Sequence, residues 1–118
     1  MLRFAFGLFP PKQVRINGAS VMLVDEAPSY GMLGPKALKG TPVSMHLIVA
    51  DVGKSFTQAV RAGATPVMPP ADMFWGDRYG MIEDPFSHRW SLATPKQNLT
   101  QDQVAAARAA MPEYAKKN

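Results

Sequence analysis

The chain has 118 residues, of which 47% are hydrophobic and 19% are charged, a composition that predicts one globular domain rather than a disordered chain. It contains no cysteine, which excludes disulfides, thiolate metal sites and thiol nucleophiles. The formal net charge is +4, but the basic residues are scattered rather than aligned on one helix, so we expect no nucleic-acid partner.

The N-terminal residues 1–11 are mostly apolar and resemble a signal peptide at first sight. Their apolar stretch is short, however, and it ends in Pro10-Pro11 without a small-residue cleavage site. No apolar run in the chain approaches the roughly 20 residues that a membrane-spanning helix needs. We therefore expect no membrane partner and a cytoplasmic location.

The next segment predicts a β-hairpin followed by a loop. Residues 12–17 alternate between polar and apolar side chains, and residues 19–25 form the returning strand. Between them, Asn17-Gly18 is a strong hairpin signal, because both residues tolerate the positive φ of a tight turn. Residues 27–42 contain three prolines and three glycines, which predicts a loop.

A second strand is predicted over residues 43–50, and it has two different faces. Met45 and Leu47 lie on one face, whereas His46 and Ile48 lie on the other. The apolar face is expected to pack on a neighbouring helix. His46 and Ile48 would then point away from that helix.

The helix itself is expected directly after this strand. Asp51 is placed as its N-cap, the helix runs over residues 52–62, and Gly63 serves as its C-cap. Residues 64–70, "ATPVMPP", predict a short strand that the double proline stops.

Two further strands and a helix complete the chain. Strands over residues 79–83 and 88–93 flank a tight turn that begins at Asp84, with proline in its second position. A capping box of Thr100 and Gln103 opens a terminal helix over residues 100–112. The element order predicts an α+β fold in a single domain, residues 1–118, with a complete βαβββ module at 43–94 and a mixed, curled sheet.

This module resembles a known superfamily. It carries "HLIVADV", "AVRAGA" and "DRYGMIEDPFSHRWSLAT" in that order, as do glyoxalase/bleomycin-resistance/extradiol-dioxygenase proteins with the vicinal oxygen chelate fold. The string "PPADMFWGDRYGMIEDPFSHRWSLAT" is similar to the PhnB-like branch. The resemblance implies two βαβββ modules, each curling a sheet into half of a cup.

The resemblance also implies that the first module is abbreviated here. Residues 1–26 would be its remnant, with Ala5-Phe6-Gly7 as the end of a lost helix. An incomplete cup exposes a sheet edge and an apolar face, to which Phe4, Phe6, Leu8 and Phe9 would add. We therefore expect a homodimer, and we leave open whether its subunits exchange elements.

Metal-dependent members of the superfamily hold a divalent ion with His and Glu side chains from inward-facing strand positions. The resemblance implies that His46 stands at one such position, whereas Ser91 and Met22 stand where two glutamates are expected. One ligand out of about four does not hold a catalytic ion. We therefore expect no cofactor and no bound metal, with His46 as the metal ligand if there is one.

No catalytic residues are predicted, and the expected site is a ligand-binding one. Trp75, Asp77 and Arg78 form either a rim at the mouth of the cup or a structural corner with an ion pair. We expect Asp84 to cap the turn and His88 to pack beneath the sheet. The candidate ligand-binding residues are His46, Ile48, Trp75, Asp77, Arg78, Arg89 and Ser91.

Three functions are compatible with these patterns. The leading one is a metal-free, glyoxalase-like protein that binds a small apolar or aromatic molecule in a dimer groove, as bleomycin-resistance proteins do without chemistry. The second is a metal-dependent lyase or isomerase of the glyoxalase type that uses His46. The third is a truncated and inactive family member. Whether the protein is an enzyme stays open, with the balance against it.

Overall fold

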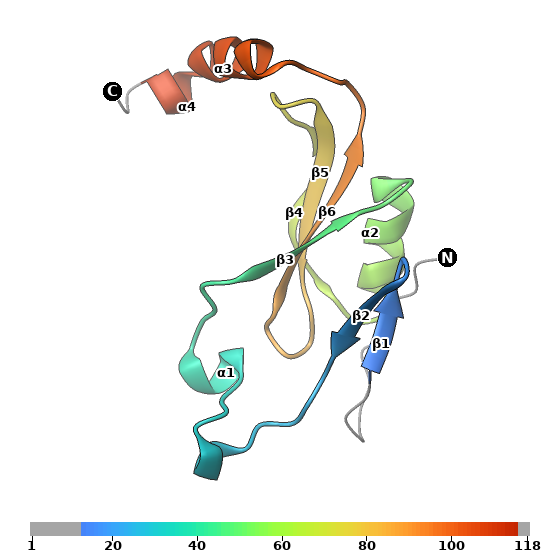
Figure 1. Ribbon diagram of the computed structural model, residues 1–118, viewed down its shortest axis with the longest axis vertical. Helices are drawn as coiled ribbons and strands as arrows, with labels where there is room; N and C mark the ends of the chain where they lie inside the picture. The colour runs from blue at the N-terminus through green and yellow to red at the C-terminus, as the bar shows by residue number, and fades with distance from the viewer. Residues whose placement is uncertain (1–12, 116–118) are drawn as a thin grey trace.

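The computed structural model of the chain describes residues 13–115 (Figure 1). The expected helix remnant around Ala5-Phe6-Gly7 and the apolar residues beside it lie outside these residues. The elements, in chain order, are β1 Gln13–Ile16, β2 Ala19–Met22, the 3₁₀ turn η1 Pro28–Tyr30, α1 Pro35–Leu38, β3 Ser44–Ile48, α2 Val52–Arg61, β4 Thr65–Asp72, β5 Asp77–Glu83, β6 Arg89–Pro95, α3 Gln101–Ala109 and α4 Pro112–Ala115.

The predicted hairpin is confirmed as the antiparallel pair β1–β2. Asn17 and Gly18 have φ angles of 48° and 83°, the pair of positive values that a type I′ hairpin turn requires. The returning strand ends at Met22 rather than at residue 25. Residues 27–42 form the expected loop, although it contains two short helical turns, η1 and α1.

The βαβββ module is a mixed sheet with α2 packed on one side. The strand order is β3-β6-β5-β4, with β3 parallel to β6 and the other neighbours antiparallel. As predicted, the Asp51 side chain caps α2, since its Oδ1 accepts a hydrogen bond of 3.1 Å from the backbone N–H of Lys54. The helix C-cap is Ala62, and Gly63 follows it with φ 116°.

The double proline does not stop β4, contrary to prediction. The strand continues through Pro69 and Pro70 to Asp72. This is possible because β4 lies at the edge of the sheet, where one side needs no hydrogen-bond partner. The register also shifts between Met68 and Ala71, and such bulges accommodate proline.

The C-terminal helix differs from prediction at its end. The capping box of Thr100 and Gln103 is present, with both reciprocal hydrogen bonds. However, α3 ends at Ala109, and Pro112 begins a second short helix instead of terminating the first. Proline is well tolerated there, because the first turn of a helix needs no backbone donor.

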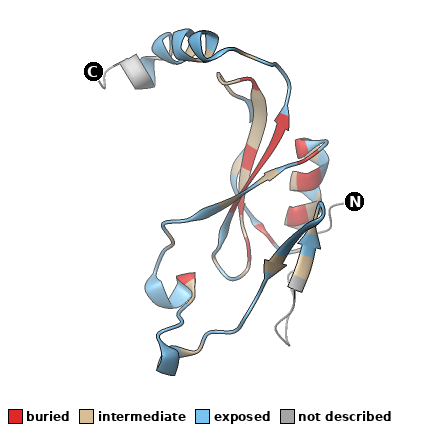
Figure 2. Cartoon of the chain, viewed as in Figure 1, coloured by how far each residue is buried: buried red, intermediate tan, exposed pale blue. Residues whose placement is uncertain are grey.

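The hydrophobic core lies between α2 and the sheet (Figure 2). Val52 and Ala59 from the helix and Ile82 and Leu92 from the central strands are each at most 1% exposed. Burial of Val52, Ile82 and Leu92 stabilises the module by roughly 1.5–3 kcal/mol for each side chain. The core is therefore one-sided, because no other described helix packs on the sheet.

Candidate functional site

The two faces of the sheet have different surroundings. Gly80 and Ile82 on β5, with Trp90 and Leu92 on β6, point toward α2. Among the described helices, only α2 packs on the sheet. The alternate residues form what we call the open face: Ser44, His46 and Ile48 from β3, Tyr79, Met81 and Glu83 from β5, and Arg89, Ser91 and Ala93 from β6.

His46 and Ser91 are the central polar pair of the open face. The parallel register of β3 and β6 sets them side by side, and the Nδ1 of His46 lies 2.7 Å from the Oγ of Ser91. Ser91 is 4% exposed, whereas His46 is exposed. The predicted orientation of β3 is confirmed, because Met45 and Leu47 pack against the core on the opposite side.

Aromatic rings continue the site along β5. The ring of Tyr79 lies 6.2 Å from that of His46 at an interplanar angle of 20°. Trp75 meets Tyr79 edge-on at 5.6 Å, and Phe74 meets Trp75 edge-on at 5.0 Å. We call His46, Tyr79, Trp75 and Phe74 the aromatic row. Tyr79 was not among the ligand-binding residues expected from the sequence. It lies two residues after Asp77 in β5, and strand alternation places the two side chains on the same face.

The corner before β5 holds Trp75 in place. Asp77 accepts a hydrogen bond of 3.0 Å from the indole Nε1 of Trp75. The corner needs Gly76, whose φ is 101° and where a Cβ would lie 2.6 Å from the backbone oxygen of Gln97. The oxygen of Gly76 in turn accepts hydrogen bonds of 2.9 Å from the backbone N–H groups of Lys96 and Gln97. Trp75 and Asp77 therefore lie together on a fixed rim.

Arg78 is not brought to this rim. In β5 it alternates with Tyr79 and so lies on the same face as Gly80 and Ile82, which point toward α2. Its guanidinium lies 3.2 Å from the carboxylate of Asp72 on β4. The sequence had suggested instead an ion pair within the corner, between Arg78 and Asp77. The reason is the alternation of a strand, which sends two adjacent side chains to opposite faces.

The turn between β5 and β6 is built around Asp84, as predicted. Its Oδ1 accepts hydrogen bonds from the backbone N–H groups of Phe86 (2.9 Å) and His88 (3.0 Å), and its Oδ2 accepts one from the indole of Trp90 (2.9 Å). His88 itself is exposed rather than packed beneath the sheet, because β6 begins only at Arg89. This cluster is structural.

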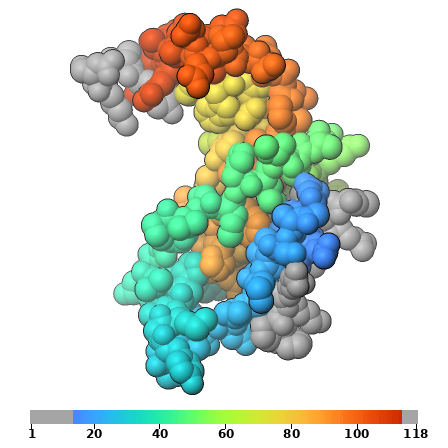
Figure 3. All heavy atoms as spheres, viewed as in Figure 1, coloured from blue at the N-terminus to red at the C-terminus, as the bar shows by residue number. Residues whose placement is uncertain are grey.

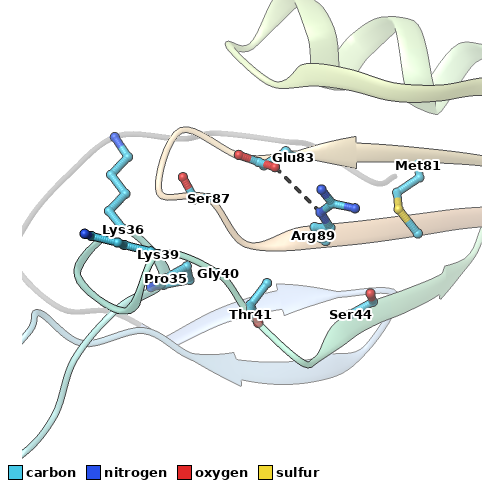
Figure 4. Close-up of a pocket in the computed structure, with 10 residues that line it drawn as sticks. All are labelled: Pro35, Lys36, Lys39, Gly40, Thr41, Ser44, Met81, Glu83, Ser87 and Arg89. Carbon is cyan, nitrogen blue, oxygen red and sulfur yellow. Dashed lines mark ion pairs between the residues drawn. The ribbon is translucent and has the colours of Figure 1, made fainter.

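Arg89 and Ile48 lie at separate ends of the open face. Ile48 is 63% exposed at the end of β3. Arg89, at the start of β6, lies 3.7 Å from Glu83 of the neighbouring strand. Beside this pair is a cleft of about 510 Å³ between the sheet and α1 (Figure 4). The side chains around it include Lys36, Lys39, Ser44, Glu83, Ser87 and Arg89.

The donor groups of the site do not fit a divalent metal within one chain. The nearest polar partner of His46 is the hydroxyl of Ser91, and Tyr79 and Met81 occupy the facing positions of β5. In residues 13–115, no group of three or more His, Cys, Asp and Glu side chains could hold a metal ion. The remaining terminal residues contain none of these four residue types. A metal needs several such ligands in one place.

Comparisons with known proteins place the chain in a family. Residues 6–92 match the model of the Glyoxalase/Bleomycin resistance protein/Dioxygenase superfamily, and the chain belongs to this superfamily. Two uncharacterized mycobacterial proteins are similar over 97 residues at 46% identity, one from Mycobacterium bovis and one from Mycobacterium tuberculosis H37Rv. The match covers 80% of this chain, which spans 64% and 57% of those curated relatives.

Solved structures agree on the fold. TioX from Micromonospora sp. ML1 superposes with a TM-score of 0.55 at 27% identity, covering 85% of this chain and 79% of TioX. A superfamily member from Sphaerobacter thermophilus gives 0.51 at 22% identity over 80% and 74% of the two chains. A hypothetical protein from S. aureus gives 0.55 at 18% identity over 78% and 73%. The mixed α+β fold expected from the sequence is thus confirmed.

One further expectation concerns the membrane. Within residues 13–115, no helix has both the length and the apolar character needed to cross a lipid bilayer.

Proposed function

We propose that the protein is a metal-free, glyoxalase-like binding protein that holds a small apolar or aromatic molecule on its open face, in a groove between two subunits. The observation that carries this proposal is the aromatic row beside the His46–Ser91 hydrogen bond. The half-buried rings of Phe74, Trp75 and Tyr79 and the exposed imidazole of His46 offer flat surfaces for stacking, and the Nδ1 of that imidazole faces a hydroxyl. The mode of action is sequestration without chemistry, as in bleomycin-resistance proteins.

Several features support the homodimer in this proposal. The described chain measures 48 × 34 × 22 Å with a radius of gyration of 16.8 Å, against about 13 Å for a compact domain of 100 residues. Figure 3 shows α3 as a projection at one end, and none of its residues is buried. Val43, just before the edge strand β3, and Ile48, at its end, are 64% and 63% exposed. A second copy would cover such surfaces.

The cysteine-free composition suits our proposal of a cytoplasmic location.

Tryptophan fluorescence tests the binding function. A panel of neutral, cationic and anionic aromatic compounds should include some that quench the fluorescence saturably, because Trp75 lies in the aromatic row. A Trp75→Phe variant should lose this response, whereas Trp90→Phe should retain it, since Trp90 points toward the core. If no compound of the panel gives a saturable response, the protein is instead the inactive family member, and the proposed function is wrong.

The alternative function is a metal-dependent lyase or isomerase. It is favoured by His46, which lies on the open face and stands where the resemblance to the superfamily implies a metal ligand. Two subunits would have to contribute ligands jointly. Metal analysis of the purified protein after reconstitution with zinc or nickel separates the two functions, with His46→Ala as the control. If the unaltered protein binds one ion per dimer and His46→Ala binds none, the metal-dependent enzyme is favoured over the metal-free binding protein.

A further inference from the structure

The cleft between α1 and the β5–β6 turn is distinct in chemistry from the aromatic row, although both adjoin the open face. Ser44, Glu83 and Arg89 are open-face residues that also border the cleft. Arg89 stands two positions from Ser91 in β6, which corresponds to roughly 7 Å along a strand. A small molecule lying on the aromatic row can therefore extend into the cleft.

The cleft carries unbalanced positive charge. Three cationic side chains border it, from Lys36, Lys39 and Arg89, against one carboxylate, that of Glu83. The Glu83–Arg89 distance of 3.7 Å joins side chains that are 33% and 48% exposed, so this ion pair is weak. Figure 4 shows the two lysines on the α1 side and the Glu83–Arg89 pair on the sheet side. Within residues 13–115, neither lysine has a carboxylate within ion-pair distance.

The backbone on both sides of the cleft is held in an uncommon conformation. Three described residues other than glycine have positive φ, and two of them, Lys39 at 60° and Ser87 at 69°, border this cleft. Lys39 has this conformation as the C-cap of α1, and Ser87 has it in the tight β5–β6 turn, so local backbone structure fixes both sides of the cleft. Lys36 belongs to α1 and Lys39 is the C-cap of that helix, so two like charges that repel each other come from one short segment. An anion between them would offset that repulsion.

We propose that this cleft binds an anionic group, a carboxylate or a phosphate, of the small molecule whose apolar part lies on the aromatic row. Lys36 and Lys39 supply point charges, and Arg89 supplies the planar N–H donors that match carboxylate and phosphate oxygens. The hydroxyls of Ser44 and Ser87 are further donors beside the cleft. For the apolar part of the ligand, this inference rests on the proposed function.

Three matched probes test the inference: benzyl alcohol, phenylacetate and benzyl phosphate, titrated into the full chain and followed by backbone amide NMR. Either anion should bind at least about tenfold more tightly than the alcohol, which is equivalent to about 1.4 kcal/mol. If benzyl phosphate shows the larger increase in affinity over benzyl alcohol, the site is one for phosphate. If phenylacetate shows the larger increase, it is one for carboxylate. Inorganic phosphate alone should shift the amides of Gly40, Thr41 and Ser87 saturably.

Two double variants provide the control. Lys36→Gln with Lys39→Gln should abolish the preference for the anions, whereas Lys54→Gln with Arg61→Gln, which removes the same charge from exposed positions of α2, should preserve it. Equal losses in both variants, or no saturable effect of inorganic phosphate at the cleft, would overturn the inference. Equal binding of all three probes would also overturn it but leave the proposed function intact. Failure of every probe to perturb the open face would contradict the proposed function itself.

Discussion

The carboxylate of Asp84 and the indole of Trp90 are joined by a hydrogen bond of 2.9 Å inside the β5–β6 turn, where they are 8% and 7% exposed. This bond ties the turn to the core, because Trp90 belongs to the cluster that also contains Ala59 and Ile82. The same carboxylate fixes two backbone N–H groups of the turn. The turn that borders the cleft is therefore anchored to the core by one side chain.

Replacement of Asp84 by alanine should destabilise the fold strongly. It would leave three donors without their acceptor, and one of them, the Trp90 indole, is buried. We expect a loss of about 3 kcal/mol in the free energy of unfolding, measured by urea titration. Asp72→Ala is the matched control, since its carboxylate is 77% exposed and pairs only with Arg78, and it should cost less than about 1 kcal/mol. Equal losses in the two variants would contradict this role of Asp84.

Substitution of Gly76 by alanine should disrupt the rim that holds Trp75. The added Cβ would clash with the backbone oxygen of Gln97 at 2.6 Å, in addition to the cost of φ 101°. Gly18→Ala is the control, because its φ is 83° but nothing lies within 4 Å of the new Cβ. Gly18→Ala should lower the free energy of unfolding by about 1 kcal/mol, and Gly76→Ala should lower it clearly more, both measured by thermal unfolding. If both cost the same, the corner is not sterically closed.

The proposed homodimer gives a direct prediction in solution. Sedimentation equilibrium at micromolar concentration should yield twice the 12.9 kDa of one chain. Ile48→Glu, which places a charge on the 63% exposed end of the open face, should shift the equilibrium to monomer. Lys54→Glu on the exposed side of α2 should leave it unchanged. A mass of one chain for the unaltered protein would rule out the dimer.

Alternation in the strands explains why much of the site was predictable from sequence. Once residues 43–50 are assigned to a strand, His46 and Ile48 must share one face, and the structure has them there. The superfamily pattern, counted from Asp84-Pro85, drew attention to Ser91 as a position where a glutamate was expected, but the hydrogen bond of Ser91 to His46 was not predicted. The turn itself was predictable because Asp and Pro at its first two positions have well-defined backbone preferences.

Other features depend on tertiary context and could not be predicted. The continuation of β4 through Pro69 and Pro70 is possible because the strand lies at the edge of the sheet, and the sequence alone does not show which strand is at the edge. The Arg78–Asp72 pair requires the shifted register between β4 and β5. Lys36 and Lys39 lie in a segment that reads only as a loop, and their approach to Arg89 is set by the path of the chain across the sheet.

The hydrogen bond between His46 and Ser91 allows a sharper test of the proposal that the protein works without a metal. Ser91→Glu restores a carboxylate at the position where the resemblance to metal-dependent members implies one. Beside His46, it should raise the affinity for zinc at least about tenfold over the unaltered protein. Ser91→Gln, of similar size but without charge, is the control. Zinc binding that is equally tight before and after Ser91→Glu, measured by calorimetry, would mean that a competent metal site already exists.

The central claim is that a small molecule binds on the open face without a metal. Its most direct test is an amide NMR titration of the chelator-treated protein with a library of aromatic fragments. We predict saturable shifts at Tyr79, Ser91 and Ala93, which lie together on the open face, and unchanged binding after addition of zinc. Shifts confined to α2, or binding that appears only when a divalent metal is restored, would contradict the account.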